Sequence, residues 1–458
     1  MNEERKENKL GSMPIGPLLF SMAVPMMLSF FIQALYNIVD SMFVAQIAEN
    51  ALTAVSLAFP MQQIMTSIGV GTAVGLSAAL PRAMGQRRHE YANELANTGI
   101  FLCLCYVALF VFLGFSFTRT FYEMQTNVSE IVEGGVKYLT TIWVMSFGMF
   151  FAIYFEKLLT STGHATYAMI AQASGAIFNI IFDPLLIFGF GPFPKLGIQG
   201  AAIATVSGQI FAGIIAFLLN HYSNHWVDFD LEKIFKPNFE AVKEIYRVGI
   251  PSMITMGLNS MTSFFVNQIL LAYSTTATAV YGIWLKLQNF CFMPAIGMNN
   301  GMVPILAYNA GQNRYDRVWG TLKFALMVIV PLMIFLTIVL ELTPNVILTM
   351  FNASDTLRGI GVNMIRIAVL SLTFGGATFL FSSSMQALRY ARFTFVINVC
   401  RNFIFPVAFF MTLSYVFHNI DTLWVAIPFT ELLGFILALF FYRIMRTQLK
   451  EEEILGPN

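Results

Sequence analysis

The sequence predicts an all-α integral membrane protein with twelve transmembrane helices in two lobes of six, and three observations support this prediction. The 458 residues are 57% hydrophobic and only 11% charged, whereas soluble domains carry about 25% charged residues. Twelve apolar stretches are each long enough to cross a bilayer, which takes about 20 helical residues. The second half of the chain also repeats the first. A net charge of +1 gives no reason to expect nucleic-acid binding.

The predicted helices follow one another with short polar connections. The first begins after about a dozen polar and charged residues, and it is too long for a signal-peptide core, so we interpret it as a spanning helix. The longest polar connection, residues 221–241, divides the chain into an N-terminal lobe (1–220) and a C-terminal lobe (242–458), and we interpret it as a cytoplasmic linker. The predicted spans are 15–47, 51–80, 92–120, 134–161, 165–190, 198–220, 242–274, 277–306, 317–340, 358–384, 390–417 and 422–446.

The second half repeats the first at a constant shift of 226 residues. The shift aligns Pro25 with Pro251 and the loop Gly85-Gln86-x-Arg88 with Gly311-Gln312-x-Arg314. Matches between apolar segments are common by chance, but a polar loop repeated at the same register is not. Each copy begins on the same side of the membrane, so we expect the lobes to be related by a pseudo-two-fold axis along the membrane normal.

The distribution of Lys and Arg predicts the orientation. One set of loops, together with both termini, holds 18 of the 26 basic residues, whereas the opposite loops hold four. We therefore expect both termini in the cytoplasm and the protein in a bacterial inner or plasma membrane.

Two aspartates lie inside these apolar stretches in similar surroundings. Tyr36 precedes Asp40 by four residues and Asn179 precedes Asp183 by four, so each pair shares a helix face. A carboxylate near the bilayer centre costs about 2.5–3.5 kcal/mol, which makes an unused one improbable. The topology puts both aspartates at a similar depth in the outer half of the bilayer, where they could share a pocket. The alternative is a packing role, with each acid satisfied by Asn or Tyr.

Two carboxylates in one pocket could couple transport to a cation gradient. Burial and mutual repulsion both disfavour two negative charges, so such a pair can hold one proton near neutral pH. Pro184 follows Asp183 and leaves the carbonyl of Ile180 without its helical partner, which indicates either a simple kink or a cation site. Na⁺ at Asp40 and Asp183 therefore remains an alternative to H⁺. A third acid, Glu156, is predicted nearer the cytoplasmic side, where it could instead extend to the interface.

The second lobe has a different set of predicted buried charges. Lys286 and Glu431 could form a structural pair or serve a functional role. The full set is Lys286, Arg366, Arg401 and Glu431.

No metal or cofactor site is predicted. His221 and His225 have the i, i+4 spacing of a metal pair, but no third ligand is nearby in the sequence. The four cysteines are isolated in apolar stretches and are interpreted as small buried hydrophobic residues.

Several segments resemble the multidrug and toxic compound extrusion (MATE) transporters, and the likeness covers nearly the whole chain. These segments are Ser21–Met27, Tyr36–Asp40, Asn179–Pro184, Gly197–Thr205, Lys286–Phe290 and Pro304–Gly311. The resemblance implies a secondary antiporter. We expect it to act as a monomer in the lipid bilayer, without a cofactor and not as an enzyme. It would export amphipathic, often cationic, small molecules in exchange for H⁺ or Na⁺.

The resemblance also implies roles for individual residues. Asp40, Asp183, Tyr36 and Asn179 map onto the cation-coupling site of DinF-like members, and Glu156 with Asp183 onto that of MepA-like members. Bending of the first helix would make Pro25 a hinge, although Pro25 also fits an ordinary kink. The stretch Gly257–Ser260 contains no acid, which counts against a sodium site in the second lobe. The residues expected to line the substrate cavity are Gln62, Thr205, Lys286 and Gln288.

Two other functions are alternatives to this one. A lipid-linked oligosaccharide flippase of the same superfamily would be expected to have a strongly basic cavity and extra helices. A membrane-embedded enzyme would need a motif such as HExxH or a nucleophile beside a buried His, and no predicted span contains one.

Overall fold

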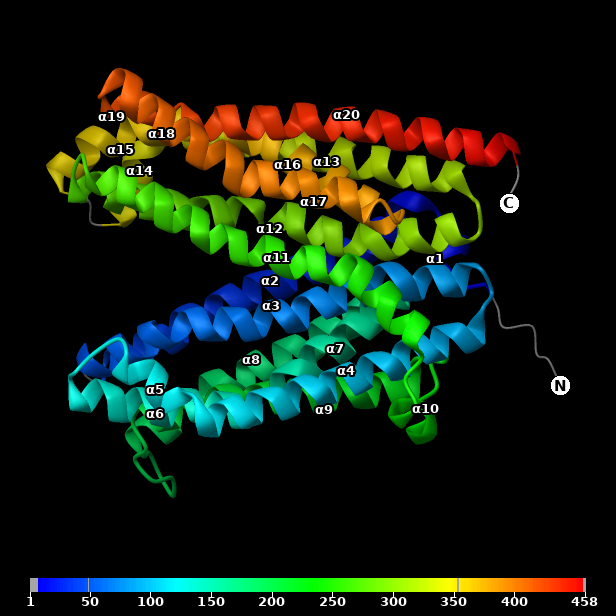
Figure 1. Cartoon of the computed structure of the whole chain (residues 1–458), viewed down its shortest axis with the longest axis horizontal. Helices are drawn as coiled ribbons and strands as arrows, with labels where there is room; N and C mark the ends of the chain where they lie inside the picture. Colours follow the sequence, from blue (N-terminus) through cyan, green and yellow to red (C-terminus); the bar gives the residue numbers. More distant parts are fainter. Residues whose placement is uncertain (1–6, 48, 352–353, 456–458) are drawn as a thin grey trace. The chain divides into compact units, whose positions relative to one another are not determined.

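The computed structural model describes residues 7–47, 49–351 and 354–455, and all regular structure in these ranges is helical (Figure 1). Within them, nine helices are long and apolar enough to cross a membrane, and two bent helix pairs pass the same test together. The remaining predicted span corresponds to α11 (Phe239–Leu271), which is 33 residues long. The predicted all-α membrane architecture is therefore confirmed. The two ends of the chain, residues 1–6 and 456–458, are predicted to lie in the cytoplasm and fall outside the described residues.

The helices agree with the predicted spans to within a few residues at most ends. Those of the first half are α1 (Lys9–Ser12), α2 (Ile15–Ala45), α3 (Glu49–Gly85), α4 (His89–Ser116), α5 (Thr118–Glu123), α6 (Ser129–Val144), α7 (Phe147–Ser161), α8 (Ala165–Phe188), α9 (Ile198–Ser223) and α10 (Leu231–Phe235). Those that follow α11 are α12 (Thr275–Gly311), α13 (Tyr315–Leu342), α14 (Pro344–Met350), α15 (Asp355–Ala368), α16 (Ser371–Ala387), α17 (Ala391–Val399), the π-helix η1 (Cys400–Ile404), α18 (Phe405–Phe417), α19 (Ile420–Leu423) and α20 (Ala426–Leu455).

Two spans predicted as single helices are bent. α6 and α7 meet at 44°, and α15 and α16 meet at 43°. At the first bend the Ser146 backbone N–H bonds to the Trp143 carbonyl at 3.2 Å, which tightens the turn. Just beyond it, α7 packs closely on α9, because a Cβ on Gly148 would lie 3.2 Å from the Val206 carbonyl oxygen. Neither bend contains proline, so the apolar pattern alone could not reveal them.

The 226-residue repeat is visible in the backbone. Arg87 and Asn313, which the shift aligns, have positive φ values of 58° and 59°. Gly163 and Arg389, also aligned, have φ values of 98° and 72°. The backbone N–H after each of this second pair bonds five residues back, His164 to Leu159 and Tyr390 to Met385. Left-handed residues are uncommon outside glycine, so their recurrence at the predicted shift confirms the repeat.

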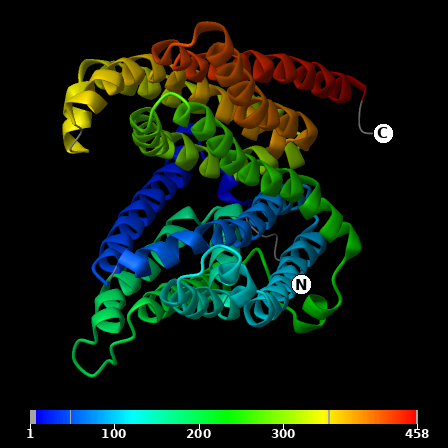
Figure 2. The ribbon, with the colours of Figure 1, turned by 60° about the vertical axis from the view of Figure 1, so that its left-hand side comes forward.

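The chain separates into two compact units. The first comprises the described part of Met1–Met13 together with Phe20–Met253 and Ala307–Asn313. The second comprises Pro14–Leu19, Ile254–Leu306 and the described part of Arg314–Asn458. Within the first unit, Figures 1 and 2 show the loop between α8 and α9 extending beyond the helices at one end.

The connection between the two halves packs on α4 of the first unit. Buried Asn97 donates to the Asp228 carbonyl and accepts from the Asp230 backbone N–H, both at 3.0 Å. Asn238 donates to Glu94 at 2.6 Å. Residues predicted only as a polar linker are therefore held in place by the buried Asn97 and the half-buried Glu94 of the first unit.

Candidate functional site

The site is built on one face of α2. Met22, Met26 and Ser29 on this face are buried, with at most 8% of each residue exposed. Tyr36 and Asp40 continue the same three- and four-residue spacing, so the face changes from apolar to polar along the helix. Pro25 lies inside α2, which runs on through it as one helix of 31 residues. A hinge at Pro25 would show as a different bend of α2 in a second conformation of the protein, so this role stays a prediction.

Asp40 meets Asp183 of α8. Their carboxyl groups lie close enough to interact directly, and Asp183 is fully buried. Two ionised carboxylates at this separation would repel each other, whereas a proton on one of them would let it donate a hydrogen bond to the other. One Asp40 oxygen, Oδ1, is buried and has no hydrogen-bond partner among the described residues. The pair predicted from depth alone is thus formed, in an arrangement that suits one shared proton.

Asn179 holds Asp183 in position from the preceding turn of α8. In the amide orientation that satisfies both of its ends, Asn179 donates to Asp183 Oδ2 at 3.0 Å and accepts from the Thr205 backbone N–H at 3.1 Å. Thr205, predicted in the substrate cavity, therefore touches the site through its backbone. α8 and α9 approach this closely at Gly175 and Gly208, because a Cβ on Gly208 would lie 2.8 Å from the Gly175 carbonyl oxygen.

Two tyrosines complete the site. Tyr36 of α2 and Tyr138 of α6 both interact electrostatically with Asp40 and Asp183. Tyr138 is 5% exposed and lies beside Gln62 of α3, whose amide nitrogen has no hydrogen-bond partner in the described chain. We call Tyr36, Asp40, Tyr138, Asn179 and Asp183 the acid cluster. Sequence reasoning missed Tyr138, because the one available signal was a hydroxyl four residues after the start of a predicted span.

Pro184 does not interrupt α8, which continues to Phe188 and ends at Gly189 with a φ of 76°. Pro184 therefore lies inside a continuous helix, and the helix is not broken at this residue. The side chains of the acid cluster supply oxygen ligands for a cation, and the Ile180 carbonyl still lacks a backbone donor at Pro184.

Glu156 is not part of the acid cluster. No hydrogen bond or ion pair joins it to Asp40 or Asp183 in the described part of the chain. It lies on α7 one turn before Thr160, whose hydroxyl donates to the Glu156 carbonyl at 2.8 Å and contacts Met26 Sδ at 3.9 Å. Glu156 thus shares the α7 face that packs on α2 near Pro25. Its side chain is partly buried.

The second unit contains an ion pair other than the predicted pair of Lys286 and Glu431. Glu431 of α20 binds Arg401 through two bonds, 2.6 Å to Nε and 2.9 Å to Nη2, with side chains 9% and 11% exposed. The hypothesis of a Lys286–Glu431 pair is therefore wrong, and the Lys286 side chain is exposed. Arg401 lies in η1, whose wider turn brings it to α20, and Gly434 leaves room for its stem, since a Cβ there would lie 3.2 Å from Arg401 Cγ.

Arg366 was also predicted as a buried charge, and this is wrong. Its side chain is 54% exposed and lies 3.9 Å from a Glu341 carboxylate oxygen. An amphipathic α15, with Arg366 on its polar side, explains the difference. Of the four predicted cavity residues, Gln62 and Thr205 adjoin the acid cluster, whereas Lys286 and Gln288 lie on α12 of the second unit.

Comparison with known families decides what kind of protein this is. The model of the MatE family matches the chain twice, over residues 25–185 and 251–412. The chain belongs to the MatE family. The two matches begin 226 residues apart, which is the shift of the internal repeat. This MATE protein is accordingly a multi-pass membrane transporter and not an enzyme, as the sequence predicted.

Relatives and solved structures agree with this assignment. The MATE protein is 25% identical over 432 residues to the FAD transporter of Shewanella oneidensis, covering 92% of this chain and 93% of that protein. It is 24% identical over 434 residues to the multidrug export protein MepA of Staphylococcus haemolyticus, covering 93% of each. An outward-facing multidrug resistance MATE transporter of the MOP superfamily has the same fold, with a TM-score of 0.90, 22% identity and coverage of 98% of this chain and 99% of that one.

Proposed function

We propose that this MATE protein is a cation-coupled antiporter that exports amphipathic, often cationic, small molecules. The observation that supports this proposal most directly is the close approach of the Asp40 and Asp183 carboxyl groups inside the apolar helices of the first unit. One proton held by the pair would remove the repulsion between them, and losing that proton would leave two adjacent negative charges in a poorly solvated site. The pair would therefore take up a cation or rearrange when it loses its proton.

Alternating access would follow from this exchange. Protonation of the pair from outside would favour the state that releases substrate, and loss of the proton to the cytoplasm would favour the state that binds it. The position of Asp40 supports transmission along α2, because the same helix carries Pro25 and contacts the face of α7 that holds Glu156. Each proton that crosses supplies about 2.3 kcal/mol per 100 mV of membrane potential.

The chemistry of the acid cluster suits H⁺ and leaves Na⁺ as the competing ion. Its two carboxylates, two hydroxyls and one amide are all oxygen donors of the kind that bind hard cations. We favour H⁺ because one proton held between two facing carboxyl groups removes their mutual repulsion. The Lys and Arg distribution supports an inner- or plasma-membrane location with both termini in the cytoplasm, and we propose that the protein acts as a monomer.

The substrate class is inferred from charge. The acid cluster would attract organic cations, which agrees with the multidrug relative MepA. The FAD transporter relative handles an anionic dinucleotide, for which an acidic site offers no complementary charge. Gln62 and Thr205 adjoin the cluster and would be the first polar groups available to a substrate in this unit.

The test is transport by the purified protein in vesicles. Vesicles would be given a fluorescent cationic dye and a pH or sodium gradient, and wild type would be compared with Asp40→Asn and Asp183→Asn. Asp316→Asn, at an exposed aspartate in the first turn of α13, is the matched control. We expect gradient-driven dye transport that both cluster substitutions abolish and the control retains. Transport that survives both substitutions would refute the coupling role. Movement of FAD or of a lipid-linked oligosaccharide, but of no cationic dye, would refute the substrate class.

A further inference from the structure

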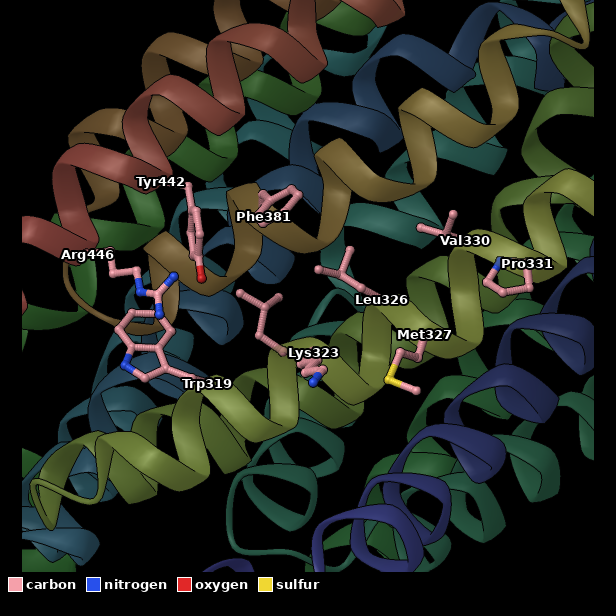
Figure 3. Close-up of a pocket in the computed structure, with 10 residues that line it drawn as sticks. Trp319, Lys323, Leu326, Met327, Val330, Pro331, Phe381, Tyr442 and Arg446 are labelled. Atoms are coloured by element: carbon pink, nitrogen blue, oxygen red, sulfur yellow. The ribbon is translucent and has the colours of Figure 1, made fainter.

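The second unit contains a groove, distinct from the acid cluster, between α13, α16 and α20 (Figure 3). Its volume is about 540 Å³, and one side of it is open to the surroundings of the protein. Figure 3 shows Trp319, Tyr442 and Arg446 grouped at one end and Val330 and Pro331 at the other. The groove therefore has a polar, aromatic end and an apolar end.

At the polar end of the groove, aromatic side chains pack against one another beside two basic side chains. Trp319 and Tyr442 meet edge to face with ring centres 5.9 Å apart, and the Arg446 guanidinium carbon lies 5.9 Å from the Trp319 ring centre. Phe381 packs on Tyr442 at 4.9 Å and closes the base of the groove. Lys323 lies one turn after Trp319 on α13.

Neither cation at this end is neutralised. Lys323 and Arg446 are both exposed, and neither forms an ion pair with a carboxylate in the described part of the chain. The two side chains line one groove from different helices, so an anion between them would be bound from both sides. Charge complementarity therefore favours an anionic group at this end.

The apolar end of the groove would be covered by a hydrocarbon group and not by an anion. Met327 is 62% exposed, and Val330 and Pro331 continue the same wall. A free inorganic anion at Lys323 would leave this wall uncovered, and a neutral hydrocarbon would leave the two cations unpaired. A ligand with an anionic head and a hydrocarbon chain covers both ends.

The depth of the groove fits a membrane lipid. Lys323 lies eight residues after the start of α13, about 12 Å along it, and Arg446 lies close to the end of the apolar span Ile420–Lys450. With the predicted orientation, both cations are at the cytoplasmic interface, where aromatic and basic side chains contact lipid headgroups. Pro331 lies about another 12 Å into the bilayer.

We propose that this groove binds an anionic phospholipid, with its headgroup phosphate between Lys323 and Arg446 and one acyl chain along Met327, Val330 and Pro331. The lipid bridges α13 and α20 and is a structural ligand of the second unit. It does not depend on the cation coupling proposed for the first unit.

Trp319 provides a direct probe of this site. The full-length protein would be reconstituted in vesicles that contain either brominated phosphatidylglycerol, which is anionic, or brominated phosphatidylcholine, which is not. Bromine quenches tryptophan fluorescence at contact distance. Of the other four tryptophans, Trp143, Trp284 and Trp424 are buried, with at most 2% of each exposed, and Trp226 is partly buried in the connection that follows α9. We expect stronger quenching by the anionic lipid, and we expect the difference between lipids to disappear in Trp319→Phe.

The basic residues are tested with charge-matched variants. Lys323→Gln combined with Arg446→Gln should reduce the preference for the anionic lipid about fivefold for each charge removed, which corresponds to roughly 1 kcal/mol per basic side chain. Arg392→Gln combined with Arg443→Gln removes two exposed charges that do not line the groove and should keep the preference. Lys323→Arg keeps the positive charge, so this variant should keep the preference for the anionic lipid and thereby show that a substitution at this position leaves the protein folded.

Two results would overturn the proposal. One is equal quenching of Trp319 by the two lipids in the wild-type protein. The other is an unchanged preference in the Lys323 and Arg446 double variant.

Discussion

The carboxyl group of Asp40 on α2 faces that of Asp183 on α8, and Asn179 fixes the second of these acids from one turn away. A proton held by this pair would let one carboxyl group donate to the other, so losing it would change both the charge of the site and the contact between the helices. The chemical event proposed for transport and the structural contact between α2 and α8 are therefore the same interaction.

Asparagine at position 183 or 40 removes the exchangeable proton but keeps the size of the side chain. We expect each variant to fold, to bind dye, and to lose gradient-driven transport at least about tenfold, since hydrogen bonds to charged groups contribute about 1.5–3 kcal/mol. Dye counterflow without a gradient separates binding from coupling. Counterflow that fails together with driven transport would point to a packing role for the acids.

The contact between α8 and α9 predicts a large effect of one methyl group. In Gly208→Ala the new Cβ would lie 2.8 Å from the Gly175 carbonyl oxygen, a backbone atom that cannot move alone. We expect a loss of about 1–3 kcal/mol in stability, measured as a lower Tm in detergent. Gly257→Ala is the control, because a Cβ there meets no atom within 4 Å and the site is helical. Equal Tm values for the two variants would show that the helices separate without cost.

The Arg401–Glu431 pair predicts non-additive substitutions. Arg401→Met should destabilise the second unit by about 3–5 kcal/mol, because it leaves a buried carboxylate unpaired, whereas adding Glu431→Leu should recover much of that loss. Thermal unfolding of the two single variants and the double variant measures the coupling. If the double variant unfolds like wild type but no longer transports dye, the pair has a role beyond structure.

His164 predicts how stability depends on pH. It lies between α7 and α8, where burial and the nearby positive charges of Lys9 and His225 lower its pKa from 6.5 to about 4. Its folded pKa is below its unfolded pKa, so the unfolded state binds more protons and stability falls as pH decreases from about 6.5 to about 4. His164→Gln should flatten Tm over this range. A Tm profile unchanged by the substitution would assign the pH dependence to other groups.

Some features of this protein depend on local sequence, and others depend on contacts between segments that are far apart in the chain. The spans could be predicted because helix length and apolar composition are local and the bilayer sets a common length. The meeting of Asp40 with Asp183 could be predicted because topology fixes the depth of each residue. Tyr138 could not, because its place in the cluster depends on how α6 packs. The Arg401–Glu431 pair depends on the π-turn η1, and the binding of the linker depends on Asn97, both of which are tertiary effects.

The most direct measurement of the central claim is the number of protons released when substrate binds. The purified protein would be mixed with a cationic dye in weakly buffered detergent solution at neutral pH, and the pH change would be recorded. The proposed antiport predicts that dye binding releases about one proton from wild type and from Asp316→Asn, and none from Asp183→Asn or Asp40→Asn. Release of the same number of protons from Asp183→Asn, or dye binding by the wild type without any proton release, would contradict it.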